Sequence, residues 1–142
     1  MKYKELNSSN GSFRKEWFNE LGEHHRVGGP AIIAYDENKL LHFEKFYVNG
    51  YLHREDGPAN IGYFPNGSVQ LEQFFLNGIQ HRLDGPAHIV YTQHGSINSE
   101  YFVISGRFIG PVSKVTFWLF WDKLSDNQRR NPNILKLLSK YS

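Results

Sequence analysis

The amino-acid sequence predicts a mainly β protein: an elongated antiparallel meander of 28-residue β-hairpin repeats, followed by a C-terminal α-helical cap. Three observations lead to this fold class. A block of residues recurs at a step of 28. Asn-Gly dipeptides, which favour hairpin turns, separate stretches in which apolar and polar residues alternate. After Pro111 the spacing of the apolar residues becomes helical.

The repeat consists of two blocks. The first contains His-Arg, Gly-Pro-Ala, Ile and Tyr, and it occurs at His25, His53 and His81, Arg26, Arg54 and Arg82, Gly29, Gly57 and Gly85, Ile33, Ile61 and Ile89, and Tyr35, Tyr63 and Tyr91. The second places Glu two residues before Phe and ends on Gly, at Glu16, Glu44, Glu72 and Glu100, Phe18, Phe46, Phe74 and Phe102, and Gly22, Gly50, Gly78 and Gly106. These blocks predict a repeat domain at 1–111, with units near 10–22, 23–50, 51–78 and 79–106.

Each unit is expected to form two strands. Asn-Gly at 10–11, 49–50, 66–67 and 77–78 favours type I′ turns, because both central residues of such a turn need positive φ. Between the turns the chain alternates with period two, so that Ala59, Ile61 and Tyr63 fall on one face. The hairpin signals together predict an antiparallel sheet of about seven or eight strands.

The Asp-Gly-Pro segments at 56–58 and 84–86 are expected to interrupt the strand ladder, because Pro has no N–H to donate and Gly tolerates a bend. The Ala that follows leaves room where neighbouring backbones approach. Each Arg is expected to pair with the Glu of the paired strand, and each His to hydrogen-bond to the bend. The residues given a structural role in the repeat are Gly50, Asp56, Gly57, Pro58, Gly78, Asp84, Gly85, Pro86, Glu44 and Glu72.

The first and last copies depart from this pattern. Val27-Gly28 stands where the later copies have Glu55-Asp56 and Leu83-Asp84, and the last copy has no His-Arg. Such departures are typical of the ends of a repeat array, where units cap the array.

The region 112–142 is predicted to form two helices. Ser113 is a suitable N-cap for the first, whose apolar stripe contains Phe117, Phe120, Trp121 and Leu124. Asn131-Pro132 begins the second, with an apolar set of Ile134, Leu135, Leu138 and Tyr141. The simpler interpretation is a cap that covers the last hairpin and blocks edge-to-edge association. The alternative is a docking face for an acidic partner, formed by Arg129, Arg130, Lys136 and Lys140.

Composition and spacing argue against an enzyme and against a metal centre. The chain has no Cys, which excludes disulfides and thiolate metal sites. Equivalent His residues would lie two strands apart, about 9–10 Å, which is too far to share one ion. Four equivalent Glu positions offer no pair with the distinct environments that a glycosidase needs. No nucleophile or phosphate-loop motif is present, and no cofactor is expected.

The charge is unevenly distributed. From Ser113 onward six basic and two acidic residues give +4, so the preceding part carries −2 of the net +2. A general nucleic-acid binder would have a basic face throughout. The N-terminal segment MKYKELNSSNGS has no apolar core of a leader peptide, and no stretch approaches a membrane span. A cytoplasmic location is expected, which would be the host cytoplasm for a phage-encoded protein.

The recurring pattern F-x-x-N-G-x-x-H-R-x-D-G-P-A…Y…N-G resembles the variant MORN-type repeats, which also make up the YwqK-like proteins known as antitoxins. The resemblance covers roughly residues 10–110, and the 28-residue step is longer than the usual MORN unit. The His-Arg-x-Asp-Gly-Pro-Ala form is similar to repeats common in bacteriophage and large-virus proteins. The resemblance implies a single extended antiparallel sheet with a non-catalytic binding role.

Two functions remain open. The first is a non-enzymatic protein-binding module, of phage or bacterial origin, that neutralises a host or defence protein through the regular face of the sheet. The alternative is a protein that binds or sequesters a nucleotide or nucleic acid through the His-Arg row, because Arg and aromatic side chains hold phosphates and stack bases. An exposed hairpin edge also favours a homodimer. The candidate binding residues are His53, Arg54, His81, Arg82, Tyr47, Phe75, Tyr101, Trp118, Arg129 and Arg130, with Trp17 and Trp121 as further aromatic candidates.

Overall fold

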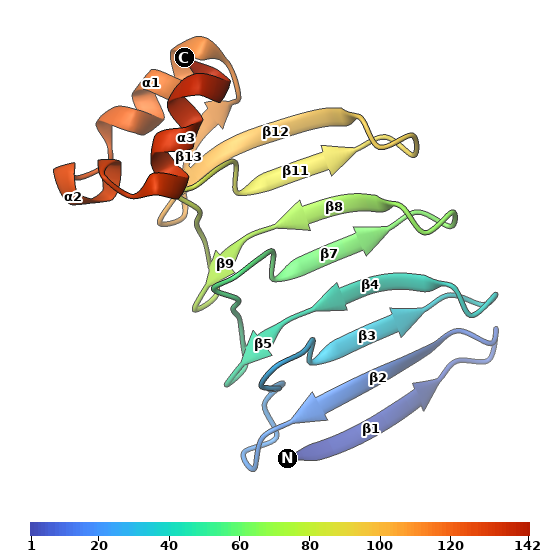
Figure 1. Ribbon diagram of the computed structural model, residues 1–142. Coiled ribbons are helices and arrows are strands. Elements are labelled where there is room, and N and C mark those ends of the chain that lie inside the picture. The colour runs from blue at the N-terminus through green and yellow to red at the C-terminus, as the bar shows by residue number, and fades with distance from the viewer.

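The computed structural model describes residues 1–142 and is mainly β, with three short helices at the C-terminus. Nine strands form one antiparallel sheet in the order β1-β2-β3-β4-β7-β8-β11-β12-β13, and Figure 1 shows them laid side by side. The predicted antiparallel sheet and the C-terminal helices are therefore confirmed. The strands are β1 (Lys2–Asn7), β2 (Phe13–Phe18), β3 (Ile32–Tyr35), β4 (Leu41–Lys45), β7 (Asn60–Tyr63), β8 (Val69–Gln73), β11 (His88–Tyr91), β12 (Ile97–Ile104) and β13 (Arg107–Pro111).

Two pairs of short strands extend the hairpins beyond the main sheet. β5 (Tyr47–Val48) pairs with β6 (Tyr51–Leu52), and β9 (Phe75–Leu76) pairs with β10 (Ile79–Gln80). The strands are more numerous than the expected total of about seven or eight. Part of the excess arises because the returning strand of each middle unit is interrupted at one residue, Phe46 or Phe74, and part because β1 precedes the first predicted unit at 10–22.

The Gly-Pro-Ala segments lie outside the strands, as predicted, and the Ala that ends each one is completely buried. Ala59 shows why. Its N–H donates to the carbonyl of Gln73 at 2.9 Å, and its own carbonyl accepts from the N–H of Phe46 at 2.7 Å. The residue is thus held between two neighbouring segments, where a larger side chain would overpack the sheet.

The Asn-Gly dipeptides form two different turns. At 49–50 and 77–78 both residues have positive φ, as a type I′ turn requires. At 10–11 and 66–67 only the glycine does, so the type I′ prediction is wrong there. In the second of these turns the side chain of Asn66 accepts a hydrogen bond from the N–H of Ser68, which selects a longer loop. Ser105-Gly106 adopts the two-residue conformation without Asn.

The first unit is out of register with the later ones by one residue. Glu44 and Glu72 both pair with Ile61, whereas Glu16 pairs with Ile32 and not with Ile33. The cause is the turn that follows β2, which is one residue longer than the corresponding turns of the later units. It closes by a hydrogen bond between the N–H of residue 19 and the carbonyl of residue 23.

Trp17 therefore takes the structural place of Phe46 and Phe74 in the first unit. Its carbonyl accepts the N–H of His25, just as the Phe46 carbonyl accepts the N–H of the next His in the chain. The sequence-based alignment of Glu16 and Phe18 with the later Glu and Phe residues is wrong for this reason.

The helices are α1 (Lys114–Asp122), α2 (Asp126–Arg129) and α3 (Pro132–Tyr141). The predicted N-caps, Ser113 and Asn131, are confirmed, and each accepts a backbone N–H at the start of its helix. The four-residue α2 was not predicted. None of the helices has the length and apolarity needed to cross a bilayer.

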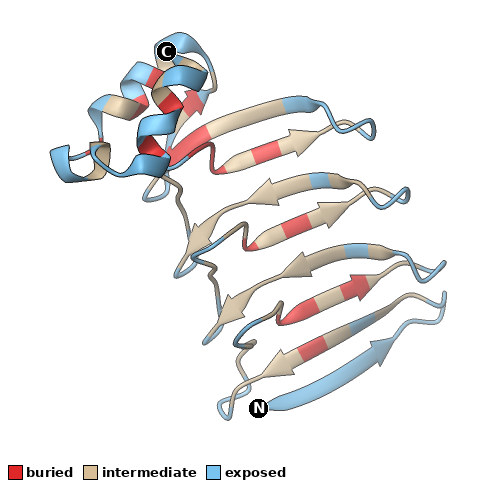
Figure 2. Ribbon diagram, viewed as in Figure 1, coloured by how far each residue is buried: buried red, intermediate tan, exposed pale blue.

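α1 and α3 pack onto the last hairpin around one buried cluster, and Figure 2 shows buried positions in red on the helices and on the adjoining strand. Leu135 is 44% exposed, so its assignment to the apolar face of α3 is wrong. Leu137 is buried in its place, because Ile134, Leu137, Leu138 and Tyr141 follow the i, i+3, i+4, i+7 spacing of one helical face. The cluster contains Phe102, Phe117, Phe120, Leu124, Ile134 and Leu137.

Candidate functional site

The guanidinium groups of the repeated Arg residues lie over aromatic rings. The guanidinium carbon of Arg82 is 4.0 Å from the ring centre of Phe74, and its Nη1 donates to the carbonyl of Pro86 at 3.0 Å. The other two copies have the same geometry, with ring distances of 4.0 Å for Arg54 over Phe46 and 3.9 Å for Arg26 over Trp17. A flat guanidinium on an aromatic face combines packing with an electrostatic attraction.

Glycine closes each Arg from the other side. A Cβ built on Gly85 would lie 2.7 Å from Cζ of Arg82, and the corresponding distance for Gly57 and Arg54 is 2.9 Å. Any side chain at these positions would displace the guanidinium. We call the Arg, the ring beneath it and the Gly-Pro backbone above it an arginine clamp. The first clamp is Trp17, Arg26, Gly29 and Pro30, the second is Phe46, Arg54, Gly57 and Pro58, and the third is Phe74, Arg82, Gly85 and Pro86.

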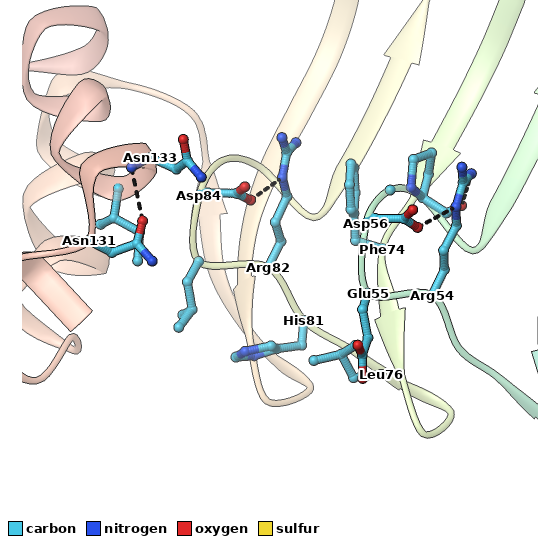
Figure 3. A pocket seen from close by; sticks show the side chains of 14 residues that line it. Arg54, Glu55, Asp56, Phe74, Leu76, His81, Arg82, Asp84, Asn131 and Asn133 are labelled. Carbon is cyan, nitrogen blue, oxygen red and sulfur yellow. Dashed lines mark hydrogen bonds and ion pairs between the residues drawn. The ribbon is translucent and has the colours of Figure 1, made fainter. Parts of the chain in front are cut away.

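The carboxylate that pairs with the clamp Arg is an Asp in its own loop, and not the Glu of the paired strand. Arg54 Nε donates to Asp56 at 3.2 Å, and Arg82 Nε donates to Asp84 at 2.8 Å (Figure 3). The prediction of Arg–Glu pairs is therefore wrong, because the ring holds the Arg over the loop instead of over the strand. The first clamp has Gly28 at the position of the Asp.

The Glu residues bond instead to the repeated Tyr residues. Tyr63 donates its hydroxyl to Glu44, and Tyr91 donates to Glu72, both at 2.5 Å. Burial, followed by the hydrogen bond to the carboxylate, raises the pKa of both Tyr hydroxyls well above the ordinary value. These pairs tie neighbouring strands together across one face of the sheet.

The repeated His residues connect each unit to the next turn. His53 Nδ1 accepts the backbone N–H of Asn77 at 3.0 Å, and His81 Nδ1 accepts that of Ser105 at 2.9 Å. His25 bonds in the same way to Asn49. The predicted bond to the adjacent Asp-Gly-Pro bend is wrong, since the partner is the turn that ends the same unit. An accepting Nδ1 places the proton of the neutral ring on Nε2.

Stability is expected to fall as the pH is lowered below about 6.5, and His81 contributes to this. Burial lowers the pKa of His81, so the unfolded chain binds its proton first and protonation favours unfolding. The loss begins near the unfolded pKa and levels off below the lowered folded one. Urea denaturation of the wild type and of His81→Gln at pH 7.5 and 5.5 measures it.

The variant is expected to lose less stability between the two pH values than the wild type does. His88, whose pKa burial also lowers, and Glu100, whose pKa burial raises, contribute equally to both proteins and cancel in the comparison. Equal losses in the two proteins would contradict the role given to His81.

Two cavities lie between the clamps. The larger, about 660 Å³, is bounded by the second and third clamps and by Asn131 and Asn133 at the start of α3 (Figure 3). The smaller, about 470 Å³, lies between the first and second clamps. Glu55 and Asp56 line both, so the cavities adjoin at this loop. No group of three His, Asp or Glu side chains is placed to hold a metal ion.

Comparison with known proteins identified no relative of this chain. No family model, curated protein or solved structure matches the chain. The site must therefore be interpreted from its own geometry.

The other sequence-predicted binding residues are scattered. Tyr47 and Phe75 are half-buried in β5 and β9, and Tyr101 packs between His88 and Phe108 on the sheet. Trp118 is exposed on α1. Arg129 donates to the carbonyl of Trp121 and pairs with Asp126, while Arg130 is exposed after α2. The structure does not bring these residues together into one site.

Two exposed apolar residues at the short turns were not predicted from the sequence. Tyr51 is 60% exposed and Ile79 is 52% exposed, and each is the residue directly after an Asn-Gly turn. The Tyr51 ring lies 3.0 Å from a Cβ built on Gly78, and Ile79 lies 3.3 Å from one built on Gly106, so successive turns contact each other. We call the exposed pair Tyr51 and Ile79 the turn ridge. The only sequence signal for this pair is an apolar residue directly after the Asn-Gly dipeptides at 49–50 and 77–78, whereas Ser follows the other two.

Proposed function

We propose that the protein is a non-enzymatic protein-binding module, built as a variant MORN-type (YwqK-like) array of 28-residue hairpin units, and that it binds and neutralises a host or defence protein in the cytoplasm. The turn ridge is the observation that carries this proposal. Two large apolar side chains stay exposed there on successive turns, although the repeated polar groups are paired within the sheet. Exposed apolar side chains held at regular spacing are typical of protein-interaction surfaces.

The nucleotide-binding alternative has less support. It requires Arg and His groups that are free to hold phosphates, but Arg54 and Arg82 bond to an Asp and to a Pro carbonyl in their own loops. The Nδ1 atoms of the His rings already accept a backbone N–H from the next turn. The clamps are therefore better explained as parts of the sheet.

Removing the apolar side chains of the turn ridge is expected to abolish partner binding without unfolding the protein. The double variant Tyr51→Ser, Ile79→Ser should weaken binding about tenfold or more, since buried apolar anchors dominate interfaces. Its free energy of unfolding should change by less than about 1 kcal/mol, because both residues are on the surface. Native mass spectrometry of the tagged protein, purified gently from a bacterial host, identifies the partner and measures its retention.

The matched control is Leu40→Ser, Ile97→Ser, which removes two exposed apolar residues at the opposite ends of the hairpins. This control should retain the partner. Equal retention by both double variants would contradict the proposal that the turn ridge binds the partner. Nucleic acid that co-purifies and is lost at high salt would favour the alternative function.

A further inference from the structure

The first clamp lacks a component that the other two contain. Arg26 stacks on Trp17 and donates Nη1 to the carbonyl of Pro30 at 3.2 Å, as its counterparts do. No carboxylate lies within 4.0 Å of its guanidinium, whereas Arg54 and Arg82 each have one on Nε. Arg26 therefore keeps a charged N–H edge for which the protein supplies no acidic partner.

The structure leaves room for such a partner from outside. A Cβ built on Gly28, at the position that Asp occupies in the later copies, would have no heavy atom within 4 Å. Arg26, Gly28 and Gly29 line the cavity of about 470 Å³ described above. The guanidinium is held in place by the ring and the Gly-Pro backbone, so it is ordered before any ligand binds.

We propose that the first clamp is a binding site for a carboxylate, supplied by an Asp or Glu side chain of the partner protein. The second and third clamps show this chemistry within the molecule, since each places an Asp carboxylate on the Nε of the stacked Arg. A charge-assisted hydrogen bond of this type is stronger than a neutral one. The inference rests on the proposed function, because it describes what one part of the partner presents.

The facing wall of the cavity restricts the partner further. Glu55 and Asp56 line the same cavity as Arg26, which disfavours a run of acidic residues. A single carboxylate is compatible with them, because Asp84 shares the larger cavity with the same two residues. The partner segment should therefore present one acidic side chain, with a basic or neutral residue beside it.

NMR of the Arg side-chain Nε–Hε groups tests the site directly. Acetate is the probe, added to 200 mM, and sodium chloride of equal ionic strength is the control. The Arg26 signal should shift along a saturating curve with acetate and much less with chloride, while the signals of Arg54 and Arg82 stay unchanged. Equal shifts at all three residues, no acetate-specific shift, or a response only to methyl phosphate would overturn the proposal.

A variant that opens a second site makes the test stricter. Asp84→Ala removes the internal carboxylate from the third clamp, and the Arg82 signal should then respond to acetate as the Arg26 signal does. Asp84 is half exposed on the surface, so the protein is expected to fold. An Arg82 signal that remains silent in this folded variant would show that an open clamp does not bind carboxylates.

The last test compares how strongly two Arg variants bind the partner protein. Arg26→Gln should weaken partner binding roughly two- to fivefold, the effect of a partly exposed charge pair. Arg82→Gln, which damages a clamp that does not line this cavity, should not weaken it by more than the error of measurement. Equal weakening by both would overturn this inference. Loss of the partner in the turn-ridge variant would leave the proposed function standing in that case.

Discussion

Replacing Phe102 with alanine is expected to lower the free energy of unfolding by about 3–5 kcal/mol. The side chain is 0% exposed and stacks on Phe120 with ring centres 4.6 Å apart. It also meets the edge of the Tyr141 ring at 5.6 Å. Because Phe102 belongs to β12 and its neighbours to α1 and α3, the cavity left behind would loosen the contact between sheet and helices. Urea denaturation, followed by Trp fluorescence and circular dichroism, measures the loss.

Trp118→Ala provides the matched control for this variant. Trp118 is larger than Phe102 and lies one residue after the buried Phe117, but it is on the exposed side of α1. Its removal should change the free energy of unfolding by less than about 1 kcal/mol. Comparable losses in the two variants would mean that the buried cluster does not hold the helices to the sheet.

Replacing Arg82 with alanine is expected to lower the free energy of unfolding by about 2–3 kcal/mol. The change uncovers the ring of Phe74, leaves Asp84 without its partner and frees the carbonyl of Pro86. Arg82→Lys should recover only part of this loss, because an ammonium group cannot stack flat on the ring while bonding in two directions. Thermal and urea denaturation of both variants measure the effect.

A variant of the first clamp tests whether the Asp carboxylate contributes to the stability of the third clamp. Arg26→Ala should be less destabilising than Arg82→Ala, because Arg26 has the ring and the carbonyl but no carboxylate. If Arg82→Ala left the stability unchanged, the clamp would not be structural, and the His-Arg row would again be a candidate for ligand binding.

The parts of the fold that depend on local chemistry were predictable from the sequence. Asn49-Gly50 indicates its turn because few residues other than Asn and Gly adopt positive φ readily. Asn131-Pro132 indicates a helix start, since Asn caps the free N–H groups and Pro fits the first helical position. In both cases neighbouring residues alone determine the conformation.

The parts that depend on contacts between units were not predictable in this way. Choosing Asp56 over Glu44 as the partner of Arg54 requires knowing that Phe46 holds the guanidinium over the loop. The shift in the first unit has a similar origin. One extra residue in the turn at 19–23 moves Trp17 into the place of Phe46. The recurring Glu and Phe residues suggest an unbroken 28-residue step, so this shift is not visible in the sequence.

The candidate site was predictable only in part. The sequence marked the His-Arg row as repeated, but its repetition reflects bonds within the sheet rather than an exposed surface. Tyr51 and Ile79 differ in residue type, so the turn ridge is not apparent as a repeat. Only their exposure and their contacts with the next turn place them in one row.

The bonds made by the His rings also set the order in which the chain can finish folding during its synthesis. His25 needs the N–H of Asn49, His53 that of Asn77, and His81 that of Ser105, which in every case lies 24 residues closer to the C-terminus. A ribosome releases the N-terminal residue of each pair first. Each hairpin therefore emerges with an acceptor still unfilled and completes its bonds only after the following turn has left the exit tunnel.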